Sequence, residues 1–572
     1  MKNTKIIAAL LVIVTVLSAA FPAYAEGDKE EVIISQLDLA DDPAAAIERV
    51  LKKVKDLDDY ELTVIVPEGT YVMNSGLHIY SNTTLIFKGN TKLIRNFAEG
   101  SMLKAGTQND VNEGYNGYKN ITVIGGEWDN SYTSTTCCIR FAHCKNVLLK
   151  DMFVKNVYDS HHMEIGAADT LTVDNVTFTG YKRYKNTSGE ALQIDPVHSE
   201  KHFKAYQLLD DTPCKNITVK NCKFTNVFSG VGTRAGVTGS YFTNIKIINN
   251  SFSNIADKAI LAFNYANSQI SGNVINGATV GIFFEEYPQT HLTSKLYMPF
   301  DSSKGTNIRT NINTKIFNNT INVVKKSGYT PSCGIGIYGG VMSSATANNT
   351  GLKSGSYLVN NISVTNNKIT LKSAASRGLE FEYVNSSTVT ANTVNGRVKA
   401  NSGINGITFY RCKKNKVSKN IVKGKVQYGI VLGSSSNTSA FNKNSISGSQ
   451  QCGIAVTGGS KLVIDTSNHF GKNGTVGAYI TDDAIKKPAI KGKLKVARKK
   501  NRNVVKWEKC ETASGYFVYR KTSKNGAYTR VATIKNRNKT VFAQNTKTKC
   551  YYLVAPYRAY KGSVIIGEKV SR

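Results

Sequence analysis

Two acidic residues stand in short segments of similar pattern, and their spacing suits the cleavage of a glycosidic bond. Glu164 is the third residue of His162–Gly166, and Asp195 is the fifth residue of Ala191–Asp195. If these segments stack as neighbouring strands, a rung spacing of about 4.8 Å and a two-residue offset of about 6.7 Å put the two backbones about 8 Å apart. That separation is typical of inverting glycosidases, in which one carboxyl group protonates the leaving oxygen and the other activates water.

Basic and polar neighbours complete this candidate centre. We expect Glu164, flanked by His161 and His162, to be the proton donor. We expect Asp195 to activate water, and Arg234, at the equivalent position one repeat later, to keep that carboxylate ionised and to grip the substrate. Glu190 is a further catalytic candidate of this centre. The candidate substrate contacts are His161, Gln193, Asp210 and Asp211.

A second interpretation assigns these side chains no chemistry. A solvent-facing sheet carries polar residues in any case, and Asp195 and Arg234 would then form a modest surface ion pair. Clustered carboxylates with histidines beside a long loop are typical of functional sites, but they are not diagnostic. Both interpretations stay open from the sequence.

A repeated pentad must position these residues. A Gly-apolar-x-apolar-x pattern recurs between about residues 120 and 470, and its alternation is that of a β-strand with side chains on opposite faces. We call the residues at one pentad position a column. The copies are Cys138–Ala142, His162–Gly166, Ala191–Asp195, Gly230–Arg234, Gly281–Glu285, Gly334–Tyr338, Gly378–Glu382, Gly406–Tyr410, Gly429–Gly433 and Gly453–Thr457.

Column five contains four further candidate substrate contacts, Glu285, Tyr338, Glu382 and Tyr410. The two tyrosine rings suit stacking on sugars, and the two acids suit a second site. The alternative is that all four are ordinary exposed strand positions, because strands favour tyrosine anyway.

A second repeated residue indicates that the strands coil. Each of seven asparagines precedes an apolar residue by two positions, and most of their intervals are 23 to 28 residues, about one turn of a three-sheet coil: Asn250, Asn273, Asn319, Asn367, Asn392, Asn420 and Asn444. Asparagine tolerates the left-handed backbone of a tight turn, and stacked asparagine amides can bond from rung to rung. A solenoid explains this regularity, because each turn buries its apolar face only against its neighbours.

Three segments resemble the first coils of the right-handed parallel β-helix proteins of the pectate lyase and polygalacturonase superfamily: Val64–Tyr71, Ser81–Leu85 and Gly125–Asp129. The resemblance covers roughly residues 60–475. It implies an all-β fold, a right-handed single-stranded parallel β-helix, capped at its N-terminal end by the amphipathic helix that we predict at residues 44–57. It also implies a polysaccharide substrate, acidic in many members, and for the lyases a calcium ion.

The sequence departs from the catalytic patterns of that superfamily. The Asn-Thr-Asp, Asp-Asp, Gly-His-Gly and Arg-Ile-Lys set of the polygalacturonases is not present, and no acidic cluster resembles the calcium site of the pectate lyases. A hydrolase that needs no cofactor is the first prediction. Two alternatives stay open: a polysaccharide lyase, and a noncatalytic glycan-binding adhesin. A lyase would use a basic residue, with Arg234, Lys182, Arg183 and Lys201 as candidates.

Three insertions follow the same strand of the repeat, at residues 196–215, 287–311 and 339–360. Loops that leave one strand on successive turns must project from one side of a solenoid. We therefore predict that they wall a groove along column three and column five, as long loops on a rigid scaffold often do.

Both ends of the chain differ from the repeat. Residues 1–25 have the charged start, apolar run and Ala23-Tyr24-Ala25 cleavage site of an export signal, and no later segment is apolar enough to span a membrane. We predict a secreted protein with a β-helix domain at residues 26–481 and a small β-sandwich at residues 494–572. The second domain resembles a fibronectin type III module, with Trp507 and a tyrosine-rich strand.

The second domain carries most of the chain's charge. Residues 484–572 contain 24 Lys and Arg against three acids, which gives +21 of the total of +33. We expect this domain to bind an anionic cell-wall polymer rather than nucleic acid. The ten cysteines show neither a disulfide framework nor a zinc-binding pair, and no metal ligands are assigned. Whether Cys510 and Cys550 are bridged stays open.

Overall fold

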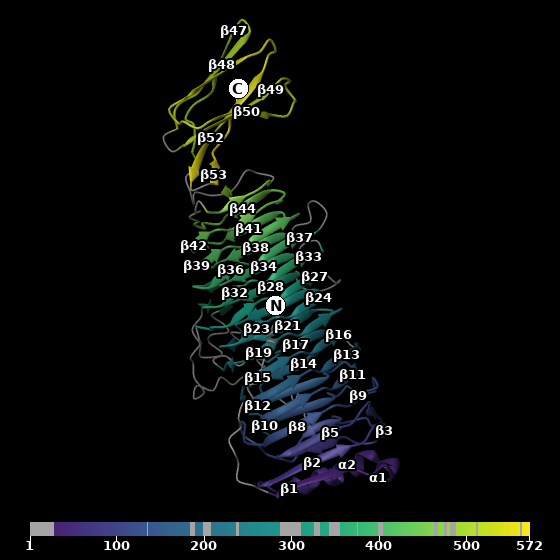
Figure 1. Cartoon of the computed structure of the whole chain (residues 1–572). Coiled ribbons are helices and arrows are strands. Elements are labelled where there is room, and N and C mark those ends of the chain that lie inside the picture. Colours follow the sequence, from purple (N-terminus) through teal and green to yellow (C-terminus); the bar gives the residue numbers. More distant parts are fainter. Residues whose placement is uncertain are drawn as a thin grey trace, which may run out of the picture.

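The chain forms a long coil of parallel strands followed by a group of antiparallel strands, as seen in a computed structural model (Figure 1). The structure describes residues 28–133, 135–183, 189–197, 208–235, 240–286, 311–324, 332–342, 355–373, 376–397, 404–462, 467–473, 478–480, 488–510, 513–560 and 563–571. The predicted export signal at residues 1–25 lies outside them.

Each turn of the coil runs along three faces. The first half of β12 (Met163–Asp174) pairs in parallel with β14 (Glu190–Asp195), and its second half pairs in parallel with β15 (Lys215–Lys220). The third face is a parallel sheet of 14 strands, to which β13 (Thr177–Lys182) belongs. The prediction of an all-β fold with large parallel sheets is confirmed.

The pentads form one continuous stack of parallel strands, which we call the pentad sheet. The stack continues from β14 through β17 (Ser229–Gly232), β21 (Lys258–Phe263), β25 (Val280–Glu285), β28 (Cys333–Tyr338), β34 (Arg377–Glu382), β38 (Asn405–Tyr410), β41 (Tyr428–Gly433) and β44 (Cys452–Val456).

From Gly230 onward the first position of each pentad named above is glycine, because the next turn lies directly against it. A Cβ atom on Gly334 would lie 2.5 Å from the carbonyl oxygen of Gly378, and one on Gly378 would lie 2.4 Å from that of Gly406. No side chain fits at such distances. The glycine column therefore sets how closely successive turns pack.

The predicted asparagine ladder runs through the buried interior. Asn273 Nδ2 donates to Asn319 Oδ1 at 2.9 Å, and Asn319 Nδ2 donates to Asn367 Oδ1 at 2.9 Å. Each Oδ1 also accepts from the backbone N–H of the preceding ladder residue, 3.0 Å in both cases. The ladder continues to Asn468, one turn beyond the last predicted member.

The left-handed backbone predicted for the ladder positions is wrong. The residue with positive φ is the one before each ladder asparagine, for example Asn318 (φ 58°), Asn366 (φ 56°) and Lys419 (φ 56°). The ladder residues are therefore selected for their side-chain amides, which satisfy polar groups that the turn would otherwise leave buried without partners.

The three insertions leave the same edge of the pentad sheet. They follow β14, β25 and β28, which belong to one stack. Residues 198–207, 287–310 and 343–354 of these insertions lie outside the described residues. In the third insertion, β29 (Gly340–Met342) pairs in antiparallel fashion with β30 (Gly355–Tyr357).

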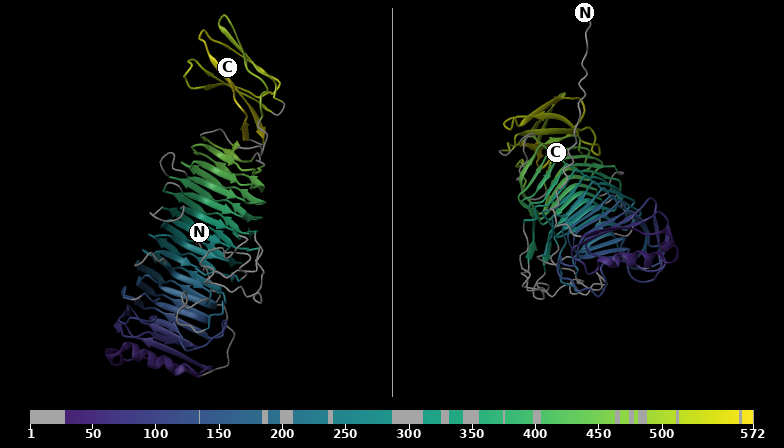
Figure 2. Two further views of the ribbon diagram at one scale, coloured as in Figure 1. Left: turned by 180° about the vertical axis from the view of Figure 1, so that it is seen from behind. Right: turned by 60° about the horizontal axis from the view of Figure 1, so that its bottom comes forward.

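Two short helices lie at the N-terminal end of the coil, α1 (Gln36–Asp41) and α2 (Pro43–Leu51), as Figure 2 shows from behind. Asp42 caps α2, and the apolar side of α2, which includes Ile47, is buried against the first strands. The predicted helix continues only as a 3-10 turn at Lys52–Val54. Its role as a cap of the core stays a prediction. Within the described residues, no helix has both the length and the apolar character needed to span a membrane.

The antiparallel strands form two sheets around their own core, which includes Trp507, Tyr516 and Tyr552. One sheet contains β47 (Lys495–Lys499), β48 (Arg502–Lys506) and β51 (Val541–Asn545). The other contains β49 (Gly515–Lys521), β50 (Thr529–Ile534), β52 (Tyr551–Tyr560), β53 (Ser563–Ile566) and β54 (Val570–Ser571). Cys510 and Cys550 are free thiols, and the likeness to fibronectin type III stays a prediction.

Replacing Asn319 by leucine tests the ladder. The variant removes the acceptor of the Asn273 backbone N–H and the amide that Asn367 Oδ1 accepts from. The Asn273 N–H is left buried without this acceptor, whereas Asn367 Oδ1 keeps the backbone N–H of residue 319 as a donor. An orphaned buried group costs about 1–3 kcal/mol, so we expect the free energy of unfolding to fall by about 1–3 kcal/mol in chemical denaturation. The control is Asn322→Ala, on the exposed face, which should change it by less than about 0.5 kcal/mol. Equal effects in the two variants would contradict the assignment.

Candidate active site

The predicted centre depends on which residues face one another across neighbouring strands. Arg140 is opposite Glu164, and Glu164 is opposite Gln193. Gly166 is opposite Asp195, so Asp195 lies one strand and two residues away from Glu164. The stacking on which the candidate centre was based is confirmed, whereas the catalytic roles stay predictions.

These side chains are buried although they belong to the outer face of the coil. The exposed fraction is 3% for Glu164, 1% for Gln193 and 1% for Asp195. Val197 and Leu209, at the two described ends of the first insertion, pack on alanines of the same face. The interpretation as a polar sheet open to solvent is therefore wrong, because the chain folds over this part of the sheet.

One network joins two carboxylates through a histidine. Arg140 Nε donates to Glu164 Oε2 at 2.5 Å, and His161 Nε2 lies 3.7 Å from Glu164 Oε1. His161 Nδ1 lies 2.8 Å from the carbonyl oxygen of Glu190 and 3.7 Å from its Oε2. A carbonyl oxygen only accepts, so Nδ1 of His161 carries a proton, and Nε2 faces Glu164.

The side chain of Glu190 occupies space that a side chain at position 232 would fill, and residue 232 is a glycine. Gly232 lies opposite Gln193, and a Cβ atom on it would lie 2.2 Å from Cγ of Glu190. Glu190 Oε2 and Gln193 Oε1 are buried and have no hydrogen-bond partner in the part of the chain that the structure describes. Unpaired buried oxygens of this kind are rare in folded proteins and are candidate ligand contacts.

Asp195 is held by three N–H donors. Its Oδ1 accepts from the backbone N–H of Arg234 at 2.7 Å and of Ala235 at 3.2 Å, and its Oδ2 accepts from Gln193 Nε2 at 2.6 Å. Burial nevertheless raises the pKa of Asp195 to about 8, against the lowering effect of the two backbone N–H donors. Asp195 therefore keeps its proton at neutral pH.

Two predictions about this carboxyl group are corrected. Arg234 is exposed, and it contacts Asp195 through its backbone N–H. The guanidinium is only a minor influence on the pKa of Asp195, and burial outweighs it. The expected ionised Asp195 is therefore wrong, because the sequence does not reveal how completely the chain covers this position.

His162 does not belong to the site. It is fully buried inside the coil, where its ring packs edge-on against Phe178 and Nε2 bonds to the carbonyl oxygen of Thr179 at 3.0 Å. Burial lowers the pKa of His162 to about 4. The chain bends before β12, so that adjacent histidines point to opposite sides, and only His161 reaches the outer face.

The aspartates of the first insertion have structural contacts. Asp210 accepts from the backbone N–H of Gly114 at 2.7 Å and from that of Thr212 at 3.0 Å. Asp211 has a left-handed backbone (φ 59°), and its N–H donates to the carbonyl oxygen of Val197 at 3.2 Å. These contacts tie the insertion to the coil, and the predicted role in substrate binding stays a prediction.

The four predicted contacts of column five lie in one register: Glu285, Tyr338, Glu382 and Tyr410 face one another in that order. Tyr338 stacks on Phe283 with ring centroids 4.9 Å apart and donates to the buried Glu380 at 2.9 Å. Burial raises the pKa of Glu285 to about 7. This second cluster includes Phe283 and Glu380, which the sequence analysis missed because it considered only column five here.

Two of the basic residues predicted for a lyase lie over aromatic rings. Lys182 lies over the ring of Tyr132 at 5.8 Å, and Arg183 lies over the ring of Phe228 at 5.2 Å. Lys201 lies outside the described residues. Within the described part of the chain, no group of three or more His, Cys, Asp or Glu side chains is arranged to hold a metal ion.

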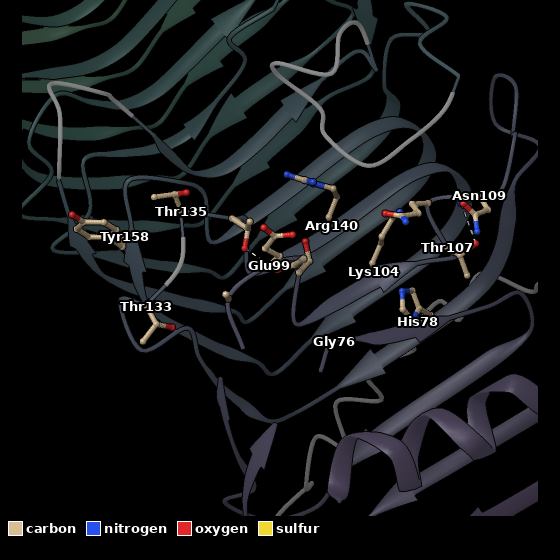
Figure 3. Close-up of a pocket in the computed structure, with 15 residues that line it drawn as sticks. Gly76, His78, Glu99, Lys104, Thr107, Asn109, Thr133, Thr135, Arg140 and Tyr158 are labelled. Atoms are coloured by element: carbon tan, nitrogen blue, oxygen red, sulfur yellow. Dashed lines mark hydrogen bonds between the residues drawn. The ribbon is translucent and has the colours of Figure 1, made fainter. Parts of the chain in front are cut away.

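A cavity next to the centre was not predicted. It has a volume of about 1000 Å³ and is open to solvent, and Figure 3 shows His78, Lys104 and Arg140 among its lining residues. Lys104 is opposite both His78 and Arg140, so column three continues from the cavity into the Glu164 network. In the sequence, Arg140 is the third residue of the pentad that precedes the Glu164 pentad. This basic residue in column three was the one signal that pointed toward the cavity.

Comparisons with known proteins support the coil. Residues 304–470 match the family model described as "Right handed beta helix region". A curated relative is the plasmin and fibronectin-binding protein A of Streptococcus pneumoniae, 23% identical over 253 residues, which are 37% of this chain and 34% of that protein. The match therefore spans about a third of that relative's length.

Among solved structures, the chain is similar to the Streptococcus pneumoniae surface protein and adhesin PfbA, with a TM-score of 0.48, 16% identity and coverage of 77% of this chain and 96% of that one. It is also similar to the tailspike protein of E. coli bacteriophage HK620, with a TM-score of 0.41, 10% identity and coverage of 90% and 88%. For DFA-IIIase from Arthrobacter chlorophenolicus the TM-score is 0.38, with 11% identity and coverage of 74% and 94%. No functional inference follows from structural likenesses this low.

The raised pKa of Asp195 makes stability depend on pH. Between its unfolded pKa near 4 and its folded pKa near 8, the folded chain keeps a proton that the unfolded chain releases, so stability falls as pH rises through this window. We expect the melting temperature of Asp195→Asn to fall less between pH 5 and pH 8 than that of the wild type. The control, Asp58→Asn, changes a side chain that is 91% exposed and should keep the wild-type slope. Equal slopes for Asp195→Asn and the wild type would contradict a buried, protonated Asp195.

Proposed function

We propose that the chain is an exported enzyme that hydrolyses glycosidic bonds of a polysaccharide. The observation that supports this most directly is a cluster of three buried carboxyl groups, Glu164, Glu190 and Asp195, on the outer face of the coil and beside an open cavity. A fold has no structural need for three buried acids there, and a buried acid with a raised pKa, as Asp195 has, is typical of active sites.

In this proposal Asp195 is the proton donor and Glu164 activates water, the reverse of the roles assigned from the sequence. A general acid must carry its proton at working pH, and a pKa near 8 provides this for Asp195. Glu164 is oriented by Arg140 and by His161. The two carboxyl groups come from backbones about 8 Å apart, which leaves room for a water molecule between acid and base.

A glycan-binding surface protein is the second candidate. The curated relative is named for binding plasmin and fibronectin, although it matches over only 37% of this chain. A protein of this kind would use the same outer face for binding without cleavage. Both candidates place the protein outside the cell or at its surface, in agreement with the predicted export signal.

The basic antiparallel domain would concentrate the protein on an anionic polymer of the cell wall. Lys495 on β47 lies directly opposite Lys506 on β48, and both side chains are exposed. Like charges on facing strands destabilise a sheet slightly, and an anionic chain along the strands would neutralise them.

Activity on a panel of plant and microbial polysaccharides tests the catalytic proposal. Release of reducing ends without ultraviolet absorbance of unsaturated products would indicate hydrolysis. Asp195→Asn and Glu164→Gln should each lower the rate by a factor of about 10² to 10⁴, and the wild-type rate should fall as pH rises above about 8 because Asp195 loses its proton. The control is Asp174→Asn, on the same strand as Glu164 but around the corner of the coil, which should retain the wild-type rate.

Three outcomes would count against this assignment. Full activity of Asp195→Asn would remove its role, and unsaturated products would indicate a lyase. Binding of a glycan with no cleavage on any member of the panel would favour the surface protein.

Charge reversal tests the basic domain. We expect Lys495→Glu with Lys506→Glu to elute from immobilised teichoic acid at a lower salt concentration than the wild type, because retention by exposed charges is screened by salt. Reversal of two exposed coil lysines, Lys416→Glu with Lys423→Glu, is the matched control and should have a smaller effect. Equal shifts would show that only the total charge of the protein matters.

A further inference from the structure

Three basic side chains lie along one wall of the cavity that adjoins the carboxyl cluster. His78, Lys104 and Arg140 occupy facing positions on β4 (Leu77–Ile79), β7 (Leu103–Ala105) and β10 (Ile139–Lys150). Neighbouring strands are about 4.8 Å apart, so the three groups span a length comparable to one sugar ring and its substituents. Figure 3 shows them together in the cavity, with Glu99 in the middle of the view between Thr135 and Lys104.

Two of the three basic side chains, Lys104 and Arg140, are largely removed from water. The exposed fraction is 6% for Lys104 and 7% for Arg140, although both line a cavity that is open to solvent. Glu99 is the acidic residue among the cavity's described lining, and it is exposed. Two buried cations on adjacent strands repel each other, and this repulsion is relieved when an anion lies between them.

Two acids outside the cavity lining orient the side chains of His78 and Arg140. Glu48 Oε1 lies 3.1 Å from His78 Nδ1, and Glu164 Oε2 accepts from Arg140 Nε. An imidazole and a guanidinium held in this way present their other nitrogens in fixed directions. Side chains held rigidly by such contacts bind a ligand with a smaller loss of conformational entropy.

The rest of the lining is neutral and polar. Hydroxyl and amide groups surround the basic wall, among them Thr107, Asn109 and Thr135, as suits the hydroxyl groups of a sugar. The ring of Tyr158 is available for stacking. A cavity of about 1000 Å³ accommodates more than a single small ion.

We propose that this cavity is a subsite for a sugar residue that carries an anionic substituent, a carboxylate or a sulfate ester, bound by His78, Lys104 and Arg140. The inference rests on the proposed function, since it names the class of glycan that the neighbouring carboxyl cluster acts on. Arg140 belongs to both places, because it lines the cavity and bonds to Glu164. The anionic residue therefore binds next to the bond that is cleaved.

Binding of an anion in the cavity changes the protonation of Lys104. Burial, and then the charge of Arg140, lower the pKa of Lys104 to about 8. An anion in the cavity favours the protonated amine, so binding near pH 8 takes up a proton, and affinity declines as pH rises further. The charged and titratable groups around Lys104 on the neighbouring elements are His78, Arg140, Glu99 and Asp110, with Glu48 behind His78 and Glu164 behind Arg140.

Calorimetric titration of the full exported chain tests the site with matched pairs of probes. The first pair is trigalacturonate and its methyl ester, the second is 3′-sialyllactose and lactose, and the third is lactose 3′-sulfate and lactose. We expect the anionic member of at least one pair to bind at least tenfold more tightly than its neutral partner. The first two pairs report a carboxylate and the third reports a sulfate.

Variants locate the binding. Lys104→Met keeps the apolar stem and removes the charge, so it should weaken the preferred anion at least tenfold and leave the neutral partner unchanged. The matched control is Lys92→Met, which changes an exposed lysine on another face of the coil and should bind as the wild type does. If Lys104→Met does not fold, His78→Gln and the uptake of a proton by the wild type near pH 8, measured in buffers of different ionisation enthalpy, replace it.

The outcomes separate this inference from the proposed function. If Lys104→Met loses the preference for the anionic glycan, the subsite is supported. If the wild type binds that glycan without cleaving it, the result counts against the enzyme. Cleavage of charged and neutral chains at equal rates in the wild type and in Lys104→Met overturns the subsite and leaves the enzyme. Equal binding of both members of all three pairs also overturns the subsite.

Discussion

The close vertical stacking of successive turns is the constraint on which the rest of the molecule depends. The glycine column lets one turn approach the next, with a carbonyl oxygen where a Cβ atom would be, and the asparagine ladder bonds the same two turns through side chains and backbone at once. Both columns are present from Asn250 onward, where a slip in register would break many contacts together. In the earlier turns the parallel pairing of β10, β12 and β14 keeps the register. Residues far apart in sequence, such as Arg140 and Gln193, are therefore brought to adjacent or nearly adjacent strands.

This regularity explains how much the sequence predicts. The pentads and the asparagines repeat once a turn, so the parallel coil, the stacking of Glu164 and Gln193, and the common edge of the three insertions follow from periodicity alone. These features are local in the repeat, and they require no knowledge of what covers the sheet.

The wrong or missing predictions concern residues whose position is not determined by the repeat. His162 lies at a corner, where the alternation of inward and outward side chains breaks, and the chain turns it into the core. The pKa of Asp195 depends on how the first insertion covers the outer face, and an insertion has no periodicity to read. The cavity lies partly in the first turns, around Gly76 and Lys104, which precede the recognisable pentads.

Rigid stacking also affects the free-energy cost of burying the carboxyl cluster. Burying several ionisable groups on the outer face is unfavourable, and a flexible sheet would relax to let water reach them. Here the backbone on both sides of β12 is fixed by its parallel pairing with β10 and β14, so the groups are satisfied in place: Arg140 by Glu164, and Asp195 by two backbone N–H groups and by retention of its proton. The oxygens of Glu190 and Gln193 that keep no partner among the described residues lie within this same rigid frame. A ligand that supplied donors to them would gain their unmet hydrogen bonds without any rearrangement of the coil, which is the general condition for a preorganised site.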